Sequence, residues 1–189
     1  MAFSAGHILQ KLFRQIIRWP LEALFGFGLF YFARLLPVRF ASAAMGGFLR
    51  IMAPLTPWHS RALRNLNHAM PDLDDAEKDQ ILRAMWHNLG RVVGEYPHIN
   101  SIVDKGWVEF VGLDHLKALD GGGFLIGAHI GNWEFGPFAA LSTGKKVAAI
   151  YRPLNNPLLS GLLHRRQETY GGDIYRKGRE AALGMVTAL

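Results

Sequence analysis

The chain has 189 residues, half of them hydrophobic, and it contains no cysteine. The hydrophobic content excludes an intrinsically disordered protein. The missing thiols exclude disulfide scaffolds, thiol nucleophiles and cysteine-ligated metal centres. The mean hydropathy of +0.09 is high for a soluble domain and far too low for a bundle of membrane spans. The length corresponds to one domain, or two at most.

The formal net charge of +6 is distributed unevenly along the chain. Residues 1–70 carry eight Lys or Arg and a single acid, Glu22, whereas residues 71–110 carry eight acids and four bases. A basic, apolar N-terminal segment favours an anionic membrane surface as its partner. No nucleic-acid-binding motif accompanies the charge, so we expect no nucleic-acid partner.

Residues 21–33 form an apolar run that is interrupted only by Glu22. The run is shorter than the roughly 20 residues of a spanning helix. A short tilted span is still compatible with it, because the charged ends of Arg18 and Arg34 would reach the membrane surface. We expect residues 1–56 to be a retained, membrane-associated helical anchor. The alternatives are a buried helix and a cleaved signal peptide with its cleavage site at residues 41–43.

A second helical segment is predicted over residues 57–104. Asp74 and Glu77 have the spacing of a capping box, and Pro97 ends the helix that follows. Six apolar residues of this helix share one face. The residues on that face are Ile81, Leu82, Met85, Leu89, Val92 and Val93.

The pattern changes at about residue 105, where short apolar runs begin to alternate with helical patterns. The predicted strands are 107–111, 124–128, 147–151 and 173–175, and the predicted helices are 113–119, 132–141, 157–170 and one that begins at Arg179. Such alternation is typical of βαβ units. We therefore predict the α/β class, with a sheet flanked by helices over residues 105–189.

The strongest chemical signal is His129, which follows the predicted strand 124–128 and precedes Glu134 by five residues. Side chains at the ends of strands in α/β sheets commonly reach a ligand cleft. A neutral imidazole accepts a proton at physiological pH, and a carboxylate on its other nitrogen fixes the tautomer. Such a pair would activate a hydroxyl group of the substrate. No pair of histidines has a metal-ligand spacing, so we predict no metal site.

The same spacing occurs once more, in His115 and Asp120. That pair lies in a predicted helix, where five residues rotate by about 500° and leave the two side chains about 140° apart. His129 and Glu134 flank a turn, which allows their side chains to converge. The geometry therefore favours the second pair.

Two segments resemble the lipid A biosynthesis acyltransferase family of the lysophospholipid acyltransferase superfamily. Residues 127–134 read GAHIGNWE, and residues 147–157 read VAAIYRPLNNP. The similarity extends from the N-terminal anchor to Arg176. The superfamily more often has aspartate at the second catalytic position, so Glu134 favours the lipid A branch.

The resemblance implies transfer of a fatty acyl chain from acyl-carrier protein to a hydroxyacyl group of a lipid A precursor in lipopolysaccharide assembly. His129 would be the general base and Glu134 its orienting partner. The implied partners are acyl-carrier protein, a phosphorylated glycolipid acceptor and the cytoplasmic face of the inner membrane. The acyl-carrier-protein thioester is a co-substrate, and the resemblance implies no bound cofactor.

Four further residues are expected at the substrate site. Asn132 would help to shape the turn, and Arg152, Arg166 and Arg176 would contact acidic groups such as phosphates. The family continues beyond Leu189, so we expect an acyltransferase domain that is incomplete at its C-terminus. The alternatives are another lysophospholipid or glycolipid acyltransferase, and an inactive membrane-binding fragment.

Overall fold

The computed structural model describes residues 5–162 and 173–188, which are mostly helical. Two compact units are formed. The sheet unit comprises Met1–Leu29, Gly106–Ala128 and Phe135–Leu189, and the helical unit comprises Phe30–Lys105 and His129–Glu134. The division expected from the sequence, with boundaries after residues 56 and 104, remains a prediction.

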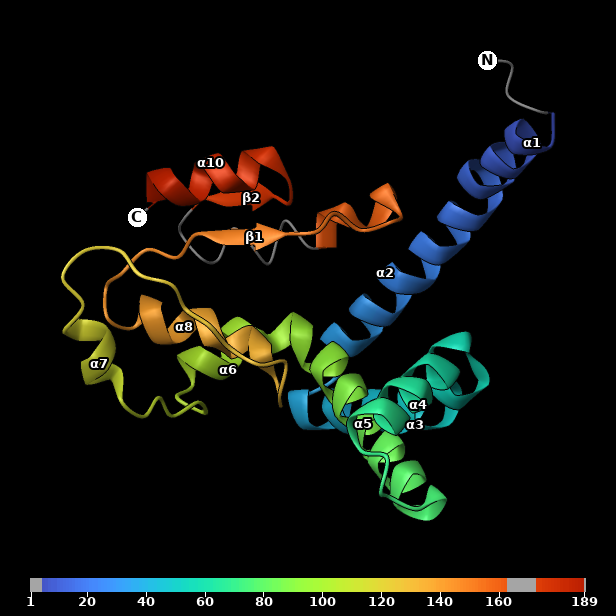
Figure 1. Cartoon of the computed structure of the whole chain (residues 1–189), viewed down its shortest axis with the longest axis horizontal. Coiled ribbons are helices and arrows are strands. Elements are labelled where there is room, and N and C mark those ends of the chain that lie inside the picture. Colours follow the sequence, from blue (N-terminus) through green and yellow to red (C-terminus); the bar gives the residue numbers. More distant parts are fainter. Residues whose placement is uncertain (1–4, 163–172, 189) are drawn as a thin grey trace. The chain divides into compact units, whose positions relative to one another are not determined.

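The N-terminal segment is a continuous helical rod (Figure 1). It consists of α1 (Ala5–Phe13), a π-helical stretch (Arg14–Arg18) and α2 (Trp19–Leu35). Within it, Leu9–Leu35 is long and apolar enough to cross a membrane, and only 11% of its apolar window is buried. At 1.5 Å per residue this stretch is about 40 Å long, which exceeds the roughly 30 Å of a bilayer core.

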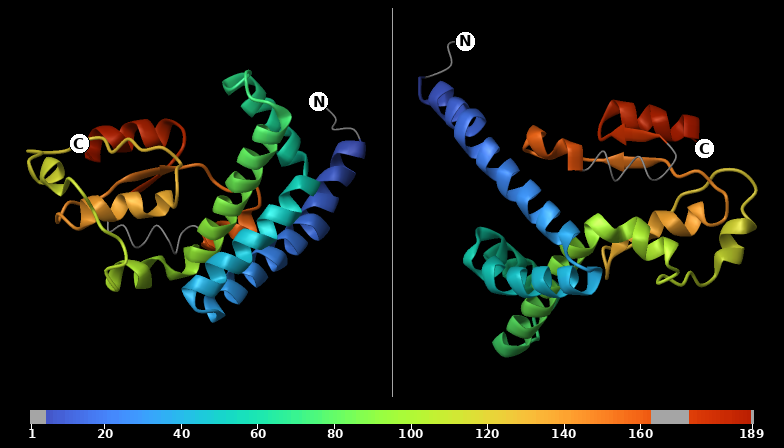
Figure 2. Two further views of the ribbon diagram at one scale, coloured as in Figure 1. Left: turned by 90° about the horizontal axis from the view of Figure 1, so that it is seen from below. Right: turned by 180° about the vertical axis from the view of Figure 1, so that it is seen from behind.

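In the helical unit, α3 (Val38–Met52) and α5 (Asp75–Glu95) lie side by side (Figures 1 and 2). The unit also contains α4 (Pro57–Ala69) and α6 (Ile99–Asp104). Gly90 and Gly94 of α5 face Met45 and Ala41 of α3, and a Cβ atom at either glycine would collide with a backbone carbonyl of α3. The absence of side chains at these two positions therefore allows α3 and α5 to approach closely.

The start of α5 confirms the predicted capping box. The Glu77 backbone N–H donates to Asp74 Oδ1 at 2.8 Å, and the Asp74 backbone N–H donates to Glu77 Oε2 at 3.0 Å. These two bonds satisfy amide groups that the first turn of a helix leaves without partners. The helix ends at Glu95, two residues before Pro97, as expected.

The apolar face predicted for α5 is only partly buried. Leu82 and Val92 are buried, but Ile81, Met85 and Val93 are between 38% and 39% exposed. The residues that α5 buries include Leu82, Trp86, Gly90 and Gly94, which recur every four positions. The buried face differs from the predicted apolar face because α5 packs against α3 through Gly90 and Gly94. Glycines have no apolar side chain, so the pattern of apolar residues does not indicate this contact.

The sheet unit contains a pair of parallel strands, β1 (Ala149–Tyr151) and β2 (Ile174–Arg176), with Tyr151 opposite Arg176. Besides the N-terminal rod up to Leu29, the described part of this unit contains the helices α7 (Leu113–Lys117), α8 (Gly136–Leu141) and α10 (Arg179–Ala188). Helix α10 lies along β2 (Figures 1 and 2), and the ring of Tyr175 occupies the space beside Gly184. The parallel pair is the outcome that βαβ units predict. Most of the predicted helix 157–170 lies outside the described residues.

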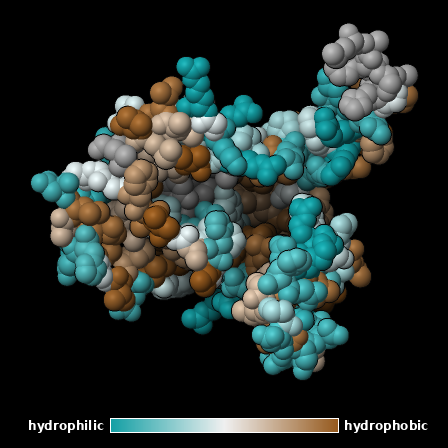
Figure 3. Space-filling model, viewed as in Figure 1, coloured by the Kyte–Doolittle hydropathy of each residue, from teal (hydrophilic) through white to brown (hydrophobic). Residues whose placement is uncertain are grey.

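Two predicted strands, 107–111 and 124–128, have no regular structure. Most of their apolar residues are exposed, and the exposed fractions of Val111 and Ile126 reach 89% and 92%. Hydrophobic side chains accordingly appear at the surface of the sheet unit (Figure 3). A buried parallel strand needs neighbours that pair with its N–H and C=O groups. The described part of the chain supplies no such neighbour to these two runs.

Candidate active site

His129 to Glu134 form a tight turn that belongs to the helical unit. Gly131 lies at its centre with a φ of 59°, a left-handed conformation that residues with a Cβ atom rarely adopt. The 3-10 turn Trp133–Phe135 follows at once, and α8 begins at Gly136. The predicted helix 132–141 is therefore confirmed for its second half and replaced by a tighter turn in its first half.

The side chain of His129 is exposed, as a proton acceptor for a bound substrate must be. Its imidazole ring lies beside the indole of Trp133, with the ring centroids 5.0 Å apart and the planes inclined by 50°. This contact restricts the directions in which the imidazole ring can point. Glu134 is half-buried one residue further on, so both predicted catalytic residues lie in the same short turn.

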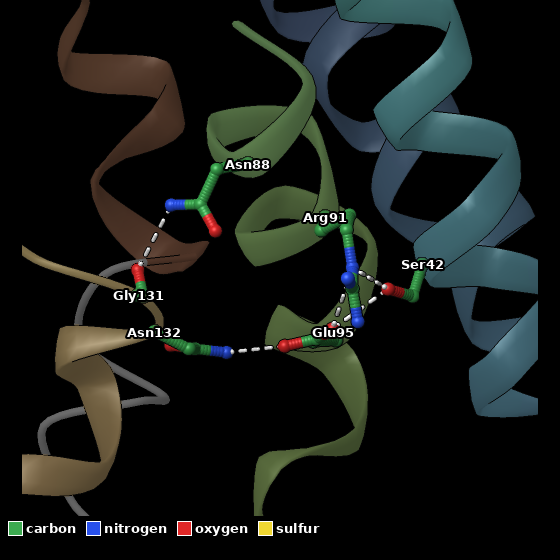
Figure 4. Close-up of polar contacts among 6 residues, drawn as sticks. All are labelled: Ser42, Asn88, Arg91, Glu95, Gly131 and Asn132. Carbon is green, nitrogen blue, oxygen red and sulfur yellow. Dashed lines mark hydrogen bonds and ion pairs between the residues drawn. The ribbon is translucent and has the colours of Figure 1, made fainter. Parts of the chain in front are cut away.

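Asn132 fixes the turn from within, through both ends of its amide group. Its Oδ1 accepts a hydrogen bond from the backbone N–H of Glu134 at 3.2 Å. Its Nδ2 donates to Oε2 of Glu95, at the end of α5, at 2.8 Å (Figure 4). The Asn132 side chain therefore bonds to the backbone of the turn and also connects the turn to α5.

Helix α5 contacts the turn at a second point. Asn88 Nδ2 donates to the carbonyl oxygen of Gly131 at 3.2 Å (Figure 4). A substitution that shifted α5 would therefore also shift the backbone between His129 and Glu134.

Glu95 is the centre of this polar cluster. Its side chain is 16% exposed, and its Oε1 accepts a hydrogen bond from the Ser42 hydroxyl at 2.7 Å. Arg91 Nε donates to the Ser42 oxygen at 3.0 Å and lies 3.8 Å from Glu95 Oε1 (Figure 4). The Glu95 carboxylate is thus held from two sides, by α3 through Ser42 and by the turn through Asn132.

Glu95, Arg91 and Asn88 are not among the site residues predicted from the sequence. A signal for them exists in the spacing, because the three positions are separated by three and four residues and share one side of α5. Polar residues that recur with helical spacing next to an apolar face indicate a polar contact with another element.

Two of the predicted arginines lie at the carboxyl ends of the two strands. Arg176 is the last residue of β2, and Arg152 follows β1 directly. Because the strands are parallel and Tyr151 lies opposite Arg176, both arginines lie at the carboxyl edge of the pair. Both are exposed, and neither has an ion-pair partner in the described part of the chain. Arg166 lies outside the described residues.

The sheet unit also contains a half-open pocket of about 560 Å³. Its walls come from Phe124, Leu125, Val147, Ile150 and Met185, together with Lys145 and Lys146. The Tyr175 phenol also lines it, and burial together with a hydrogen bond to Asp173 raises the pKa of that phenol.

The described residues contain no group of three His, Cys, Asp or Glu side chains that could hold a metal ion.

Comparison with known proteins gives one match. The family model described as bacterial lipid A biosynthesis acyltransferase covers residues 9–189, which include the turn from His129 to Glu134 and the basic edge of the sheet. No curated protein and no solved structure matches the chain significantly. The match extends over nearly the whole sequence, and the chain therefore belongs to the bacterial lipid A biosynthesis acyltransferase family.

Proposed function

We propose that the chain transfers a fatty acyl group from an acyl-carrier-protein thioester to a hydroxyacyl chain of a phosphorylated lipid A precursor. The family supports acyl transfer in lipid A biosynthesis. The observation that supports the assignment to His129 is the combination of an exposed imidazole and a turn that is fixed to α5. A general base needs both access to the substrate and a defined position.

In this mechanism, His129 removes the proton from the acceptor hydroxyl as its oxygen attacks the thioester carbonyl. The resulting tetrahedral intermediate collapses and breaks the carbon–sulfur bond. The imidazolium returns the proton to the departing thiolate, so that an ester and a thiol are formed. Glu134 orients the imidazole and stabilises its positive charge. General base catalysis of this kind contributes about 10²–10⁴ to the rate.

The basic edge of the sheet would bind the acidic groups of the substrates. Arg152 and Arg176 are exposed at this edge, and a guanidinium group binds phosphate through two parallel hydrogen bonds. Arg166 completes the proposed set. Acidic carrier protein and a phosphorylated glycolipid are both attracted by a chain with a net charge of +6.

The N-terminal rod would attach the enzyme to the cytoplasmic face of the inner membrane. Leu9–Leu35 has the length and composition of a span, and Leu21, Leu24 and Phe25 are between 59% and 72% exposed. A retained anchor also agrees with α3, where Ala41 and Ser42 of the alternative cleavage site are buried.

The test is acyl transfer by membranes that contain the chain. Acyl-carrier-protein thioesters and an under-acylated lipid A precursor are supplied, and the product is read by mass spectrometry. We expect a mass gain of one acyl chain that His129→Ala and Glu134→Ala abolish. The matched controls are His115→Ala and Asp120→Ala, which remove an exposed pair with the same spacing and should retain activity. Acylation of a lysophospholipid in place of the lipid A precursor would contradict the proposed acceptor.

A further inference from the structure

We propose that Glu95 is a positioning residue for the reaction, acting through Asn132 on the turn that carries His129 and Glu134. The inference rests on the proposed function of that turn. Glu95 itself lies at the C-terminal end of α5, 37 positions before Asn132 in the sequence. It acts by holding the amide of Asn132, and it does not contact the reacting atoms.

Each end of the Asn132 amide makes one hydrogen bond. Glu95 Oε2 accepts the Asn132 Nδ2–H bond, and this contact directs Asn132 Oδ1 at the backbone N–H of Glu134. An asparagine amide that lost its partner at Nδ2 would be free to rotate and to release the Glu134 amide. The bond from Asn88 to the Gly131 carbonyl would remain, but the bond from Asn132 to the Glu134 amide would be lost.

The Glu95 carboxylate is itself held in place. A carboxylate that is largely removed from water needs donors, and the Ser42 hydroxyl at 2.7 Å and the nearby Arg91 guanidinium supply them. Ser42 is buried in α3, so α3 determines the position of Glu95 and Glu95 determines that of the turn. A carboxylate whose purpose was only to join α3 to α5 would need no contact with Asn132.

The chain supplies a matched control on the same helix. Asp79 is paired with Arg83 at 2.6 Å, as Glu95 is placed next to Arg91, but Asp79 is half-exposed and has no contact with the turn. Asp79→Asn therefore removes a carboxylate from α5 without disturbing Asn132.

We expect Glu95→Ala to lower kcat by about 10- to 100-fold with KM nearly unchanged, because misplacement of a catalytic group by about 1 Å costs on that order. Glu95→Gln retains an oxygen that can accept from Asn132 and should restore most of the activity. Asn132→Ala should reproduce the loss, and the double variant Glu95→Ala/Asn132→Ala should be no slower than either single variant. Asp79→Asn should behave as the wild type.

Hydrogen–deuterium exchange supplies a readout that does not depend on turnover. Glu95→Ala should accelerate exchange of the peptide that spans residues 129–134, whereas Ser42→Ala should accelerate it less. A wild-type chain that transfers no acyl group would refute the proposed function, and the exchange experiment would still decide the positioning role. Unchanged exchange and unchanged kcat in Glu95→Ala would overturn the inference, as would an equal loss of kcat in Asp79→Asn.

Discussion

The close contact between α3 and α5 predicts that Gly94→Ala destabilises the protein. A Cβ atom at position 94 would collide with the Ala41 carbonyl and would lie 3.0 Å from the Met45 Cβ. Neither neighbour can rotate away, because one is backbone and the other is fixed to it. Alanine gains about 1 kcal/mol over glycine in a helix, whereas overpacking costs about 1–3 kcal/mol. We expect a net loss of up to about 2 kcal/mol.

Gly47→Ala is the matched control. Gly47 lies in the same helix pair, within α3, but a Cβ atom there would meet no atom within 4 Å. This variant should gain the helical preference without the collision and become more stable by about 1 kcal/mol.

The assay is urea unfolding of the detergent-purified chain, followed by circular dichroism. With a slope of about 2 kcal/mol per molar urea, the midpoint of Gly94→Ala should fall by up to about 1 M, and that of Gly47→Ala should rise. Equal midpoints for the two alanine variants would refute the packing argument. So would a Gly94→Ala variant that is more stable than the wild type.

Two further predictions concern the buried face of α5 and the N-terminal rod. Leu82 is 3% exposed and Ile81 is 39% exposed. In the same urea assay, Leu82→Ala should therefore lower the free energy of unfolding by about 2–5 kcal/mol, and Ile81→Ala should lower it clearly less. Equal losses would contradict the burial of Leu82 and the exposure of Ile81. Leu24 is 72% exposed in the candidate span, so Leu24→Asp should reduce the fraction of the chain that sediments with membranes, because an acid at the centre of a span costs about 2.5–3.5 kcal/mol. An unchanged membrane fraction would argue against insertion of this helix.

Features with local causes could be predicted from the sequence. The capping box at Asp74 and the end of α5 before Pro97 follow from contacts between residues three or four apart or from the missing N–H of proline. The pattern of apolar residues also predicted three elements of the sheet unit. They are the helix that begins at Leu113, the strand around Ile150 and the helix that begins at Arg179. The turn that carries His129 was predicted from its place between a predicted strand and a predicted helix.

Features that depend on distant partners could not be predicted in this way. The runs 107–111 and 124–128 have the composition of strands, but a strand forms only where another strand pairs with it. Glycine contacts determine the buried face of α5, and glycines carry no apolar side chain that a periodicity could reveal. The contact of Glu95 with Asn132 joins positions 37 residues apart, so only the fold brings them together.

The measurement that tests the central claim most directly is the rate of single acyl transfer by His129→Ala, compared with the wild type and with His115→Ala. All three chains are assayed in membranes at equal abundance, with acyl-carrier-protein thioester and lipid A precursor as substrates. We predict that His129→Ala is slower by about 10²–10⁴ and that His115→Ala retains the wild-type rate. Wild-type activity in His129→Ala would contradict the assignment of His129 as the general base.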